Sequence, residues 1–387
     1  MVPQGDEFDI LVDRRGTWAM RWEKYAHRDV IPLWVADADF RAPPAVLAAM
    51  RARLEHGVLG YTVPPPGLRE AICARYARLW GWRIEPDWIV FLPGVVPGLH
   101  LAVRHLVPSG GHVLVPTPVY HHFRRAAERA PRAYSAVPLV LEDGRWVWDL
   151  DRLAAEARPE SRLLLVCNPQ NPGGTVLRRA ELERLAEFAL RHDLCICCDE
   201  IHAELVLEED CRHMPIASLG PEVSRRTVTL ASPNKAFNFP GAGCAWAIAE
   251  DERLREAIAR DHHATVPEPS VFGWAAALAV CRGECDDWLA RQIAYLRGNR
   301  DRLAAALGRM PGLAAAHVEA TFLAWIDARG LGHADPHALF LAHGVALSPG
   351  AQFGARGYVR LNFATPRARL EAALSRMASA VASTRAR

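Results

Sequence analysis

The chain contains 387 residues, and its 46 basic and 44 acidic side chains leave a formal net charge of +2. A balance this even argues against a nucleic-acid-binding protein, because polyanions are bound by clustered basic residues. Although 50% of the residues are hydrophobic, no stretch reaches the roughly 18 consecutive apolar residues of a membrane-spanning helix. We therefore expect a globular protein that binds neither nucleic acid nor a membrane.

The N-terminus and the cysteines both favour a reducing compartment. No basic segment followed by an apolar core opens the sequence (MVPQGDEFDI), so no secretory signal is visible and a cytoplasmic location is expected. The nine cysteines are odd in number and lack paired CxxC spacing. This predicts free thiols and no bound metal.

The expected elements begin after an irregular N-terminal arm. Residues 1–42 contain many aromatic and charged side chains and are expected to wrap around another part of the protein. A proline pair at 43–44 then opens an amphipathic helical pattern that ends near Gly57, and a second helical pattern covers residues 68–80.

Short apolar runs alternate with helical stretches through the middle of the chain. They lack polar alternation, as expected for strands that helices cover on both faces. The runs are residues 89–92, 112–115, 163–167, 194–198, 227–231 and 244–248. This pattern predicts an α/β fold with a mostly parallel sheet in a large domain over residues 43–285.

The pattern changes from about residue 285. Long helical patterns cover 286–309 and 366–381, and strand-like segments cover 321–327 and 357–363. These elements predict a smaller C-terminal α/β domain over residues 286–387.

Lysine is nearly absent from the chain. Only Lys24 and Lys235 occur, so the other 44 of the 46 basic residues are arginine. A primary amine, unlike a guanidinium, can form a Schiff base and release its proton near neutral pH. A lysine retained in such a chain is therefore a candidate for that chemistry. We expect Lys24 to be an ordinary surface residue, whereas Lys235 has to be judged by its surroundings.

The residues that follow the apolar runs form the candidate site, because ligands of open α/β sheets collect at the carboxyl ends of the strands. Residues 93–98 (PGVVPG) lead into a helix, where free backbone N–H groups can hold a phosphate, although such turns also serve packing alone. Residues 168–174 (NPQNPGG) offer amide donors to a ligand or form a simple turn.

Two charged residues follow the next runs. Asp199 needs a cationic partner if it is buried at a strand end, but it also suits a helix cap or a Mg²⁺ ligand. Lys235 is placed at the same sheet edge. A phosphate cradle, an amide, a carboxylate and a lysine at one edge match the needs of pyridoxal 5′-phosphate (PLP), which requires an amine for a Schiff base and an anion facing its pyridinium nitrogen.

At this point the sequence resembles the fold-type I PLP-dependent enzymes, the aspartate aminotransferase superfamily, over nearly its whole length. Within them it is similar to the cystathionine β-lyase (C–S lyase) branch. The motifs are WVADADF (34–40), GYTVPPPGLREAI (60–72), PGVVPGLH (93–100), PTPVYHHF (116–123), CNPQNPGG (167–174), CDEIHAEL (198–205), SPNKAFN (232–238), ATFLAW (320–325) and YVRLNFATP (358–366). CDEIH together with SPNKAFN is the most specific combination.

The resemblance implies a role for each site residue. Lys235, Asp199 and Tyr120 would be catalytic: Lys235 would form the Schiff base and move the proton, Asp199 would pair with the pyridine nitrogen, and Tyr120 would stack on the ring. The other residues implied to bind the cofactor are Asn171 and His202 at the ring hydroxyl, and Val95, Val96 and Ser232 at the phosphate.

The resemblance also implies a substrate contact and an assembly. Arg360 would bind the substrate α-carboxylate. Tyr61 would reach the cofactor phosphate of a neighbouring subunit, which implies a homodimer with shared active sites. Two simpler readings stay open: Tyr120 as a packed aromatic residue and Arg360 as a surface ion-pair partner.

Three departures from the family pattern concern the pocket. Gly243 stands eight residues after Lys235, where many relatives carry an arginine that contacts the phosphate. Neutralisation of the phosphate would then depend on the turn at Gly94 and on the dipole of the helix that follows it. Ala38 replaces the methionine of WVADMDF and would leave room for a larger substrate. His121 and His122 stand where the lyases often have prolines.

The implied reaction is β-elimination from an L-cysteine S-conjugate, either cystathionine or a larger secondary-metabolite thioether, to a thiol, pyruvate and ammonia. An aminotransferase shares every step up to the carbanion, so fold analogy does not separate the two. Decarboxylation or oxidative deamination of a similar conjugate is a further alternative. A transcriptional regulator is disfavoured, because residues 1–42 are too short for a DNA-binding module.

Overall fold

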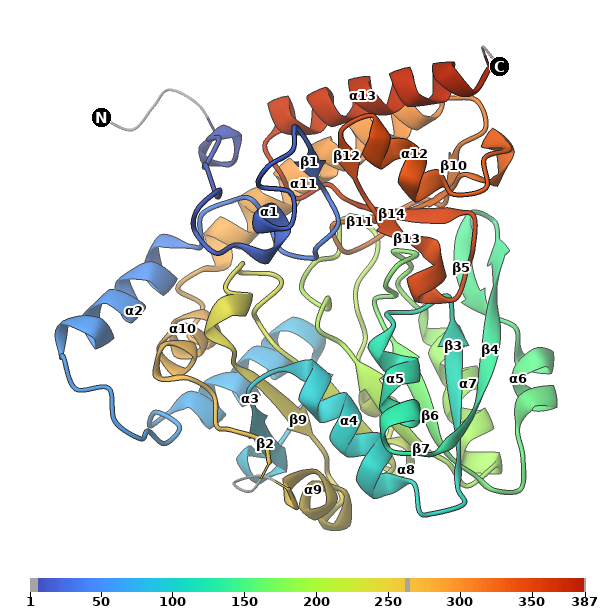
Figure 1. Cartoon of the computed structure of the whole chain (residues 1–387). Helices are drawn as coiled ribbons and strands as arrows, with labels where there is room; N and C mark the ends of the chain where they lie inside the picture. The colour runs from blue at the N-terminus through green and yellow to red at the C-terminus, as the bar shows by residue number, and fades with distance from the viewer. Residues whose placement is uncertain (1–5, 262–264, 386–387) are drawn as a thin grey trace.

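The computed structural model describes residues 6–261 and 265–385 (Figure 1). Its main feature is an eight-stranded sheet with the order β2-β9-β8-β7-β6-β3-β4-β5. The strands are β2 (Ile89–Leu92), β3 (His112–Thr117), β4 (Ala133–Glu142), β5 (Arg145–Trp148), β6 (Ser161–Cys167), β7 (Cys195–Asp199), β8 (Thr227–Ala231) and β9 (Ala245–Ile248). Neighbours from β8 to β4 pair in parallel, whereas β9 is antiparallel to both β2 and β8, and β5 is antiparallel to β4. The predicted mostly parallel sheet is confirmed.

Helices cover both faces of the central part of this sheet, which explains why its central strands are apolar along most of their length. On one face lie α4 (Val95–Leu106), α5 (His122–Arg129) and α9 (Glu252–Ala259). On the other lie α6 (Leu150–Glu156), α7 (Arg179–Arg191) and α8 (Pro221–Ser224). The packing around β2 and β9 is completed by α3 (Leu68–Trp80) and α10 (Val271–Cys281), and α2 (Pro44–Glu55) packs against α10.

A second, antiparallel sheet lies in the C-terminal part of the chain, in the upper part of Figure 1. Its order is β10-β11-β14-β13, from β10 (Ala314–Ala315), β11 (Leu323–Asp327), β13 (Ser348–Pro349) and β14 (Tyr358–Asn362). The helices of this part are α11 (Asp286–Leu307), α12 (Pro336–Ala342) and α13 (Arg367–Arg385). The expected division into residues 1–42, 43–285 and 286–387 stays a proposal, supported by the separation of the two sheets along the chain.

The N-terminal arm packs against this C-terminal part. Its short strand β1 (Ile31–Pro32) pairs in parallel with β12 (Val345–Ala346), and its helix α1 (Met20–Glu23) precedes that strand. The next residues are held by a side chain of β14, because Asn362 Nδ2 donates to the carbonyl oxygens of Val35 (2.5 Å) and Asp37 (2.6 Å). The arm therefore follows the small sheet and brings residues 34–40 over the edge of the large one.

Two strands of the large sheet, β4 and β5, are absent from the sequence-based prediction. β4 alternates between buried and exposed residues, and β5 returns antiparallel to it after Asp143-Gly144, both of which have positive φ. An Asp-Gly turn between strands is a strong hairpin signal. The prediction relied on continuous apolar runs and so overlooked an alternating edge hairpin.

Candidate active site

Strand register brings the predicted site segments to one edge of the large sheet. Cys167 is paired with Asp199, and Asp199 with Leu230, so β6, β7 and β8 end at nearly the same level. The segments that follow these strands carry Asn171, His202 and Lys235. The structure thus places together the residues that the strand-end argument selected.

Lys235 lies in the turn after β8, beneath the N-terminal arm. Its Nζ donates a hydrogen bond to the carbonyl oxygen of Ala36 at 2.7 Å, across 199 residues of sequence. Burial lowers the pKa of Lys235; the charge of Asp37 opposes this shift, Arg360 adds to it, and Asp199 opposes it. An amine with a lowered pKa is suited to act as a nucleophile and as a proton acceptor near neutral pH.

Asp199 is the last residue of β7 and is 7% exposed. One carboxylate oxygen accepts a hydrogen bond from the backbone N–H of Ile201 at 3.1 Å. Burial raises the pKa of Asp199 to about 6, although that hydrogen bond and the charge of Lys235 oppose the shift. A buried carboxylate with a raised pKa gains most from a cationic ligand, because such a ligand compensates its lost solvation.

His202 lies on the same turn and is buried. Its Nδ1 has no hydrogen-bond partner within the described residues. Burial lowers the pKa of His202 to about 3, with smaller contributions from Lys235 and Arg360, so the imidazole is neutral. A neutral, buried ring nitrogen without a partner can donate to or accept from a ligand atom.

Arg360 reaches the site from β14, in the small sheet. Its guanidinium donates to Asn171 Oδ1 at 3.0 Å and to the carbonyl oxygen of Trp34 at 2.9 Å, while its Nε is buried without a partner in the described part of the chain. Burial lowers the pKa of Arg360 to about 10. No carboxylate forms an ion pair with it among residues 6–261 and 265–385, so the surface ion-pair alternative does not describe Arg360.

Tyr120 follows β3 and packs, partly buried, against the core of the large sheet. Its backbone N–H donates to the carbonyl oxygen of Asn171 at 3.1 Å, which fixes it beside the Arg360–Asn171 pair. Burial raises the pKa of the Tyr120 phenol. Its predicted stacking on a cofactor ring stays a prediction.

The predicted phosphate cradle lies at the start of α4, and its role stays a prediction. Gly94 precedes the helix in an extended conformation without a side-chain cap, so the first N–H groups of α4, beginning at Val95 and Val96, have no side-chain acceptor from that position. Gly243 lies against this turn: a Cβ added there would stand 2.8 Å from the carbonyl oxygen of Pro93. This contact explains locally why Gly243 has no side chain.

Ser232 is buried near the same turn, but its hydroxyl is already engaged. It donates to the carbonyl oxygen of Cys244 at 2.6 Å and accepts from the N–H of Asn234 at 3.1 Å. Its predicted contact with a phosphate stays a prediction.

Tyr61 lies fully exposed in the loop after α2, so a single chain does not bring it into the site.

Two further histidines follow Tyr120. Its ring centroid is 4.6 Å from that of His121 and 5.2 Å from that of His122, and His122 Nδ1 is 3.3 Å from Nε2 of His100 on α4. Burial lowers the pKa of both His121 and His122 to about 4, and neighbouring histidines and arginines add to the shift. They are therefore neutral polar groups beside Tyr120.

Ala38 has a different setting from the expected one. It is 3% exposed, and it belongs to a buried apolar cluster that includes Phe8, Leu33 and Phe40. Its role in determining substrate size stays a prediction, but this burial favours a packing role.

We expect Ala38→Met to be overpacked, which costs typically about 1–3 kcal/mol of stability. Activity toward cystathionine and toward a bulky aryl cysteine conjugate should then fall in the same proportion. Thermal unfolding together with kcat/KM for both substrates checks this result. A selective loss for the bulky substrate would place Ala38 in the pocket instead.

Some contacts of the site have no local sequence signal. Asn238, three residues after Lys235, accepts from the N–H of Ala38 at 3.0 Å and donates to the carbonyl oxygens of Ala38 (3.2 Å) and Phe40 (2.6 Å). Both segments belong to quoted motifs, yet nothing in either motif indicates that they touch. The arm is thus a wall of the site.

The structure also bears on the cysteines and on membranes. All nine cysteines are free thiols. Residues 6–261 and 265–385 contain no group of three or more His, Cys, Asp or Glu side chains that could hold a metal ion. Within the same ranges, no helix combines the length and apolar character needed to cross a membrane.

Comparison with known proteins assigns this arrangement to a family. Residues 28–377 match the family model described as aminotransferase class I and II. The chain is 34% identical to cystathionine β-lyase PatB of Bacillus subtilis (strain 168), over 97% of this chain and 99% of PatB. The crystal structure of OvoB matches with a TM-score of 0.95 at 45% identity, covering 97% of this chain and 99% of OvoB. A PLP-bound C–S lyase from Staphylococcus hominis matches with a TM-score of 0.90 at 29% identity, covering 97% and 98%.

Proposed function

Because the chain belongs to the class I and II aminotransferase family, we propose that it is a PLP-dependent C–S β-lyase acting on an L-cysteine S-conjugate. The observation that carries the proposal is the convergence of Lys235, Asp199 and the Arg360–Asn171 pair at one sheet edge. PatB is named a cystathionine β-lyase and the S. hominis protein a C–S lyase. These names support the lyase reaction over transamination.

The residues of the site fit PLP. Asp199 is buried with a raised pKa and suits a pyridinium nitrogen, and the unpartnered Nδ1 of His202 suits the ring hydroxyl. The uncapped start of α4 suits a phosphate group. Lys235 would hold the aldehyde carbon covalently, and Asn171 would donate its amide to the ring hydroxyl while its Oδ1 accepts from Arg360.

When bound, PLP supplies an electron-withdrawing ring conjugated to the substrate nitrogen, which accepts the electron pair left at Cα. The chain's own residues position the substrate and move the protons. Arg360 binds the α-carboxylate, which replaces its present contact with the carbonyl oxygen of Trp34. Lys235 Nζ takes the Cα proton and delivers one to the sulfur as the Cβ–S bond breaks. With one water consumed, the products are a thiol, pyruvate and ammonium.

The arm and the small sheet enclose this chemistry. The carbonyl oxygen of Trp34 and the side chain of Arg360 meet on one side, and the Ala36 carbonyl oxygen contacts Lys235 on the other. Enclosure excludes water and strengthens electrostatic interactions within the site. Neutral His121 and His122 beside Tyr120 add polar groups that can contact the β-substituent.

The reaction is tested by incubating the PLP-loaded protein with L-cystathionine and, separately, with an aryl cysteine conjugate. We expect pyruvate and free thiol in equal amounts without any added keto acid. Keto acid formed only with an amino-group acceptor would indicate an aminotransferase. Carbon dioxide or peroxide release would indicate decarboxylation or oxidative deamination.

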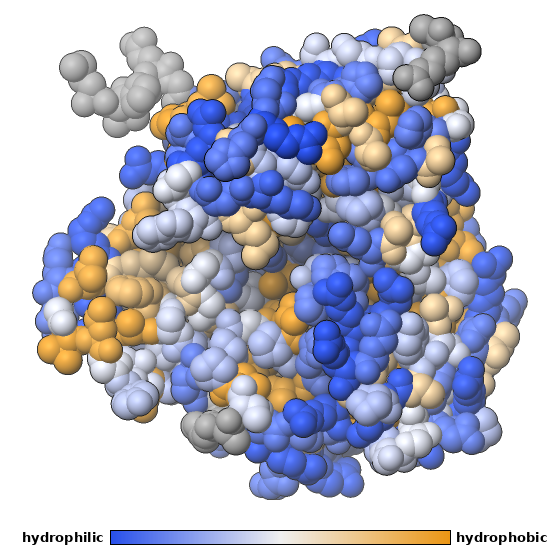
Figure 2. Space-filling view, viewed as in Figure 1, coloured by the Kyte–Doolittle hydropathy of each residue, from blue (hydrophilic) through white to orange (hydrophobic). Residues whose placement is uncertain are grey.

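We also infer a homodimer that shares its active sites. Figure 2 shows orange side chains gathered at the side of the molecule where α2 and the following loop lie. The exposed apolar and aromatic residues there are Leu54, Val58, Leu59, Tyr61 and Val63. Apolar patches of this kind mark association sites. A second copy of the chain would cover this patch and bring Tyr61 toward a cofactor phosphate.

Subunit mixing tests this arrangement. Tyr61→Ala and Lys235→Arg should each be impaired as homodimers. If Tyr61 serves the partner's site, a heterodimer of the two variants contains one intact site, so co-expression restores activity. Absence of restored activity in heterodimers, or a monomer in sedimentation equilibrium, would contradict the proposed homodimer.

We also propose a cytoplasmic location, which the nine free thiols support.

A further inference from the structure

Lys235 has a second acidic neighbour besides Asp199, and it comes from the N-terminal arm. Asp37 directly follows Ala36, whose carbonyl oxygen accepts the 2.7 Å hydrogen bond from Lys235 Nζ. Among the charges that act on Lys235, that of Asp37 is the largest one favouring the protonated amine. Asp37 is therefore close enough to the amine to influence its charge.

The carboxylate of Asp37 lies between two arginines of the N-terminal arm. Its Oδ2 accepts a hydrogen bond from Arg14 Nη2 at 2.6 Å. Its Oδ1 is buried and accepts no hydrogen bond within the described residues, and Arg21 Nη1 lies 3.5 Å away. A buried carboxylate oxygen without a hydrogen bond is costly unless positive charge balances it, and Arg21 supplies part of that charge. Lys235, whose Nζ bonds to the carbonyl oxygen of the preceding residue, supplies a further positive charge nearby.

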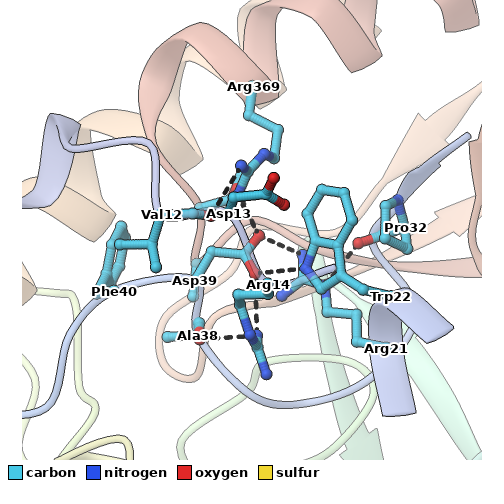
Figure 3. Close-up of polar contacts among 12 residues, drawn as sticks. Val12, Asp13, Arg14, Arg21, Trp22, Pro32, Ala38, Asp39, Phe40 and Arg369 are labelled. Atoms are coloured by element: carbon cyan, nitrogen blue, oxygen red, sulfur yellow. Dashed lines mark hydrogen bonds and ion pairs between the residues drawn. The ribbon is translucent and has the colours of Figure 1, made fainter. Parts of the chain in front are cut away.

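Arg14 and Arg21 make further contacts within the arm, and Figure 3 shows those with Pro32, Ala38 and Asp39. Arg14 also donates to Asp39 Oδ1 at 3.0 Å and to the carbonyl oxygen of Ala38 at 3.2 Å. Arg21 donates to the carbonyl oxygens of Pro32 and Asp37 at 2.5 and 2.9 Å. Both arginines therefore tie the Asp37 segment to the arm.

Asp39 does not compete for Lys235. Its carboxylate accepts from Trp22 Nε1 at 3.1 Å and from Thr365 Oγ1 at 2.9 Å, and Arg369 Nη1 lies 3.0 Å from it. Burial opposes ionisation, but the charges of Arg21 and Arg369 lower the pKa of Asp39 to about 2. Asp39 anchors the arginines, and Asp37 is left to act on the site.

Other charged groups also face Lys235. Asp199 on β7 is negative and Arg360 on β14 is positive, while His202 is neutral. Asp199 is the group suited to the pyridine nitrogen in the proposed function. Its charge is then balanced by that nitrogen, which leaves Asp37 as the negative neighbour of the lysine.

We propose that Asp37 is a positioning residue whose carboxylate, oriented by Arg14 and Arg21, holds the proton on Nζ of Lys235 during the reaction. The inference rests on the proposed function, in which neutral Nζ takes the Cα proton and becomes an ammonium group. Asp37 stabilises this ammonium until its proton passes to the departing sulfur. The Ala36 carbonyl oxygen accepts a second N–H of the same group and keeps it in place.

The test is a pH titration of the visible absorbance of the PLP-loaded protein without substrate. This absorbance reports protonation of the Lys235 nitrogen linked to the cofactor. In Asp37→Asn the negative neighbour is lost, so the midpoint should fall by about one pH unit. In Arg14→Gln the carboxylate loses its neutralising partner, so the midpoint should rise. Asp13→Asn is the matched control: Asp13 is exposed, bonds only to nearby Arg15 among described residues, and should leave the midpoint unchanged.

If the titration midpoints of Asp37→Asn and Arg14→Gln shift in opposite directions, the cause is the charge of Asp37. A loosened arm would shift the midpoints of both variants in the same direction. Equal midpoints in all proteins, or shifts of the same sign, would overturn the inference while leaving the lyase intact. If Asp37→Asn does not fold, Arg14→Gln decides alone: a rise supports the inference, and no change or a fall overturns it. A wild-type protein that gains no visible absorbance from PLP would overturn the proposed function as well.

Discussion

Lys235→Arg abolishes both turnover and the visible absorbance that PLP gives with the wild-type protein; this is the largest effect we expect of any substitution. A guanidinium keeps the positive charge but does not form a Schiff base. Loss of general acid–base catalysis alone costs about 10²–10⁴-fold, and loss of the covalent link removes the rest. An absorbance scan after PLP addition and a pyruvate assay measure the two effects.

The other lysine provides the matched control. Lys24 is exposed, and its Nζ lies 4.4 Å from the ring centroid of Trp34. Arginine can make the same cation–π contact, so Lys24→Arg should retain wild-type absorbance and rate. Full activity in Lys235→Arg would refute a PLP-dependent mechanism at this site.

Asp199→Asn is expected to bind PLP and yet lose most of the elimination rate. Asparagine has nearly the same shape, so the phosphate and ring contacts stay. It lacks the charge that keeps the pyridine nitrogen protonated, and this charge matters most as electrons leave Cα. The loss of one preorganised electrostatic contact typically costs about 10²–10³-fold in kcat. Single-turnover kinetics and the PLP dissociation constant separate rate from binding.

Asp193→Asn is the control for Asp199. Asp193 precedes the same strand, has φ of 52°, and pairs through an exposed carboxylate with Arg226. Asparagine tolerates that backbone conformation, so fold and rate should be unchanged. If instead Asp199→Asn reacts within a few-fold of wild type, another acid faces the pyridine nitrogen.

The large sheet was predictable because helices bury its strands on both faces. Each apolar run from 89–92 to 244–248 corresponds to a strand, shifted by at most a few residues. β4 and β5 were not predicted because they form an edge hairpin. One face of each strand is exposed there, so the sequence has no continuous apolar run. The prediction thus succeeded where burial dictates composition and failed at the edge.

The site was predictable in its chemistry but not in its contacts. The scarcity of lysine and the position after a strand selected Lys235, and the same strand-end argument selected Asp199. By contrast, Arg360 meets Asn171 across 189 residues, and Ala36 meets Lys235 across 199. The family resemblance assigned Arg360 and Asn171 to one site but did not predict their contact with each other. The second contact was not anticipated either, because backbone carbonyl oxygens carry no signature in a sequence.

The parallel pairing of β1 with β12 affects the order in which the chain folds during its synthesis on the ribosome. Ile31 is synthesised long before its partner Val345. Domains generally fold as units during synthesis, N-terminal parts first, but this arm has no strand to join until the C-terminal segment emerges. The nascent chain can therefore complete its large sheet, with Lys235 and Asp199 in place, well before the arm covers them.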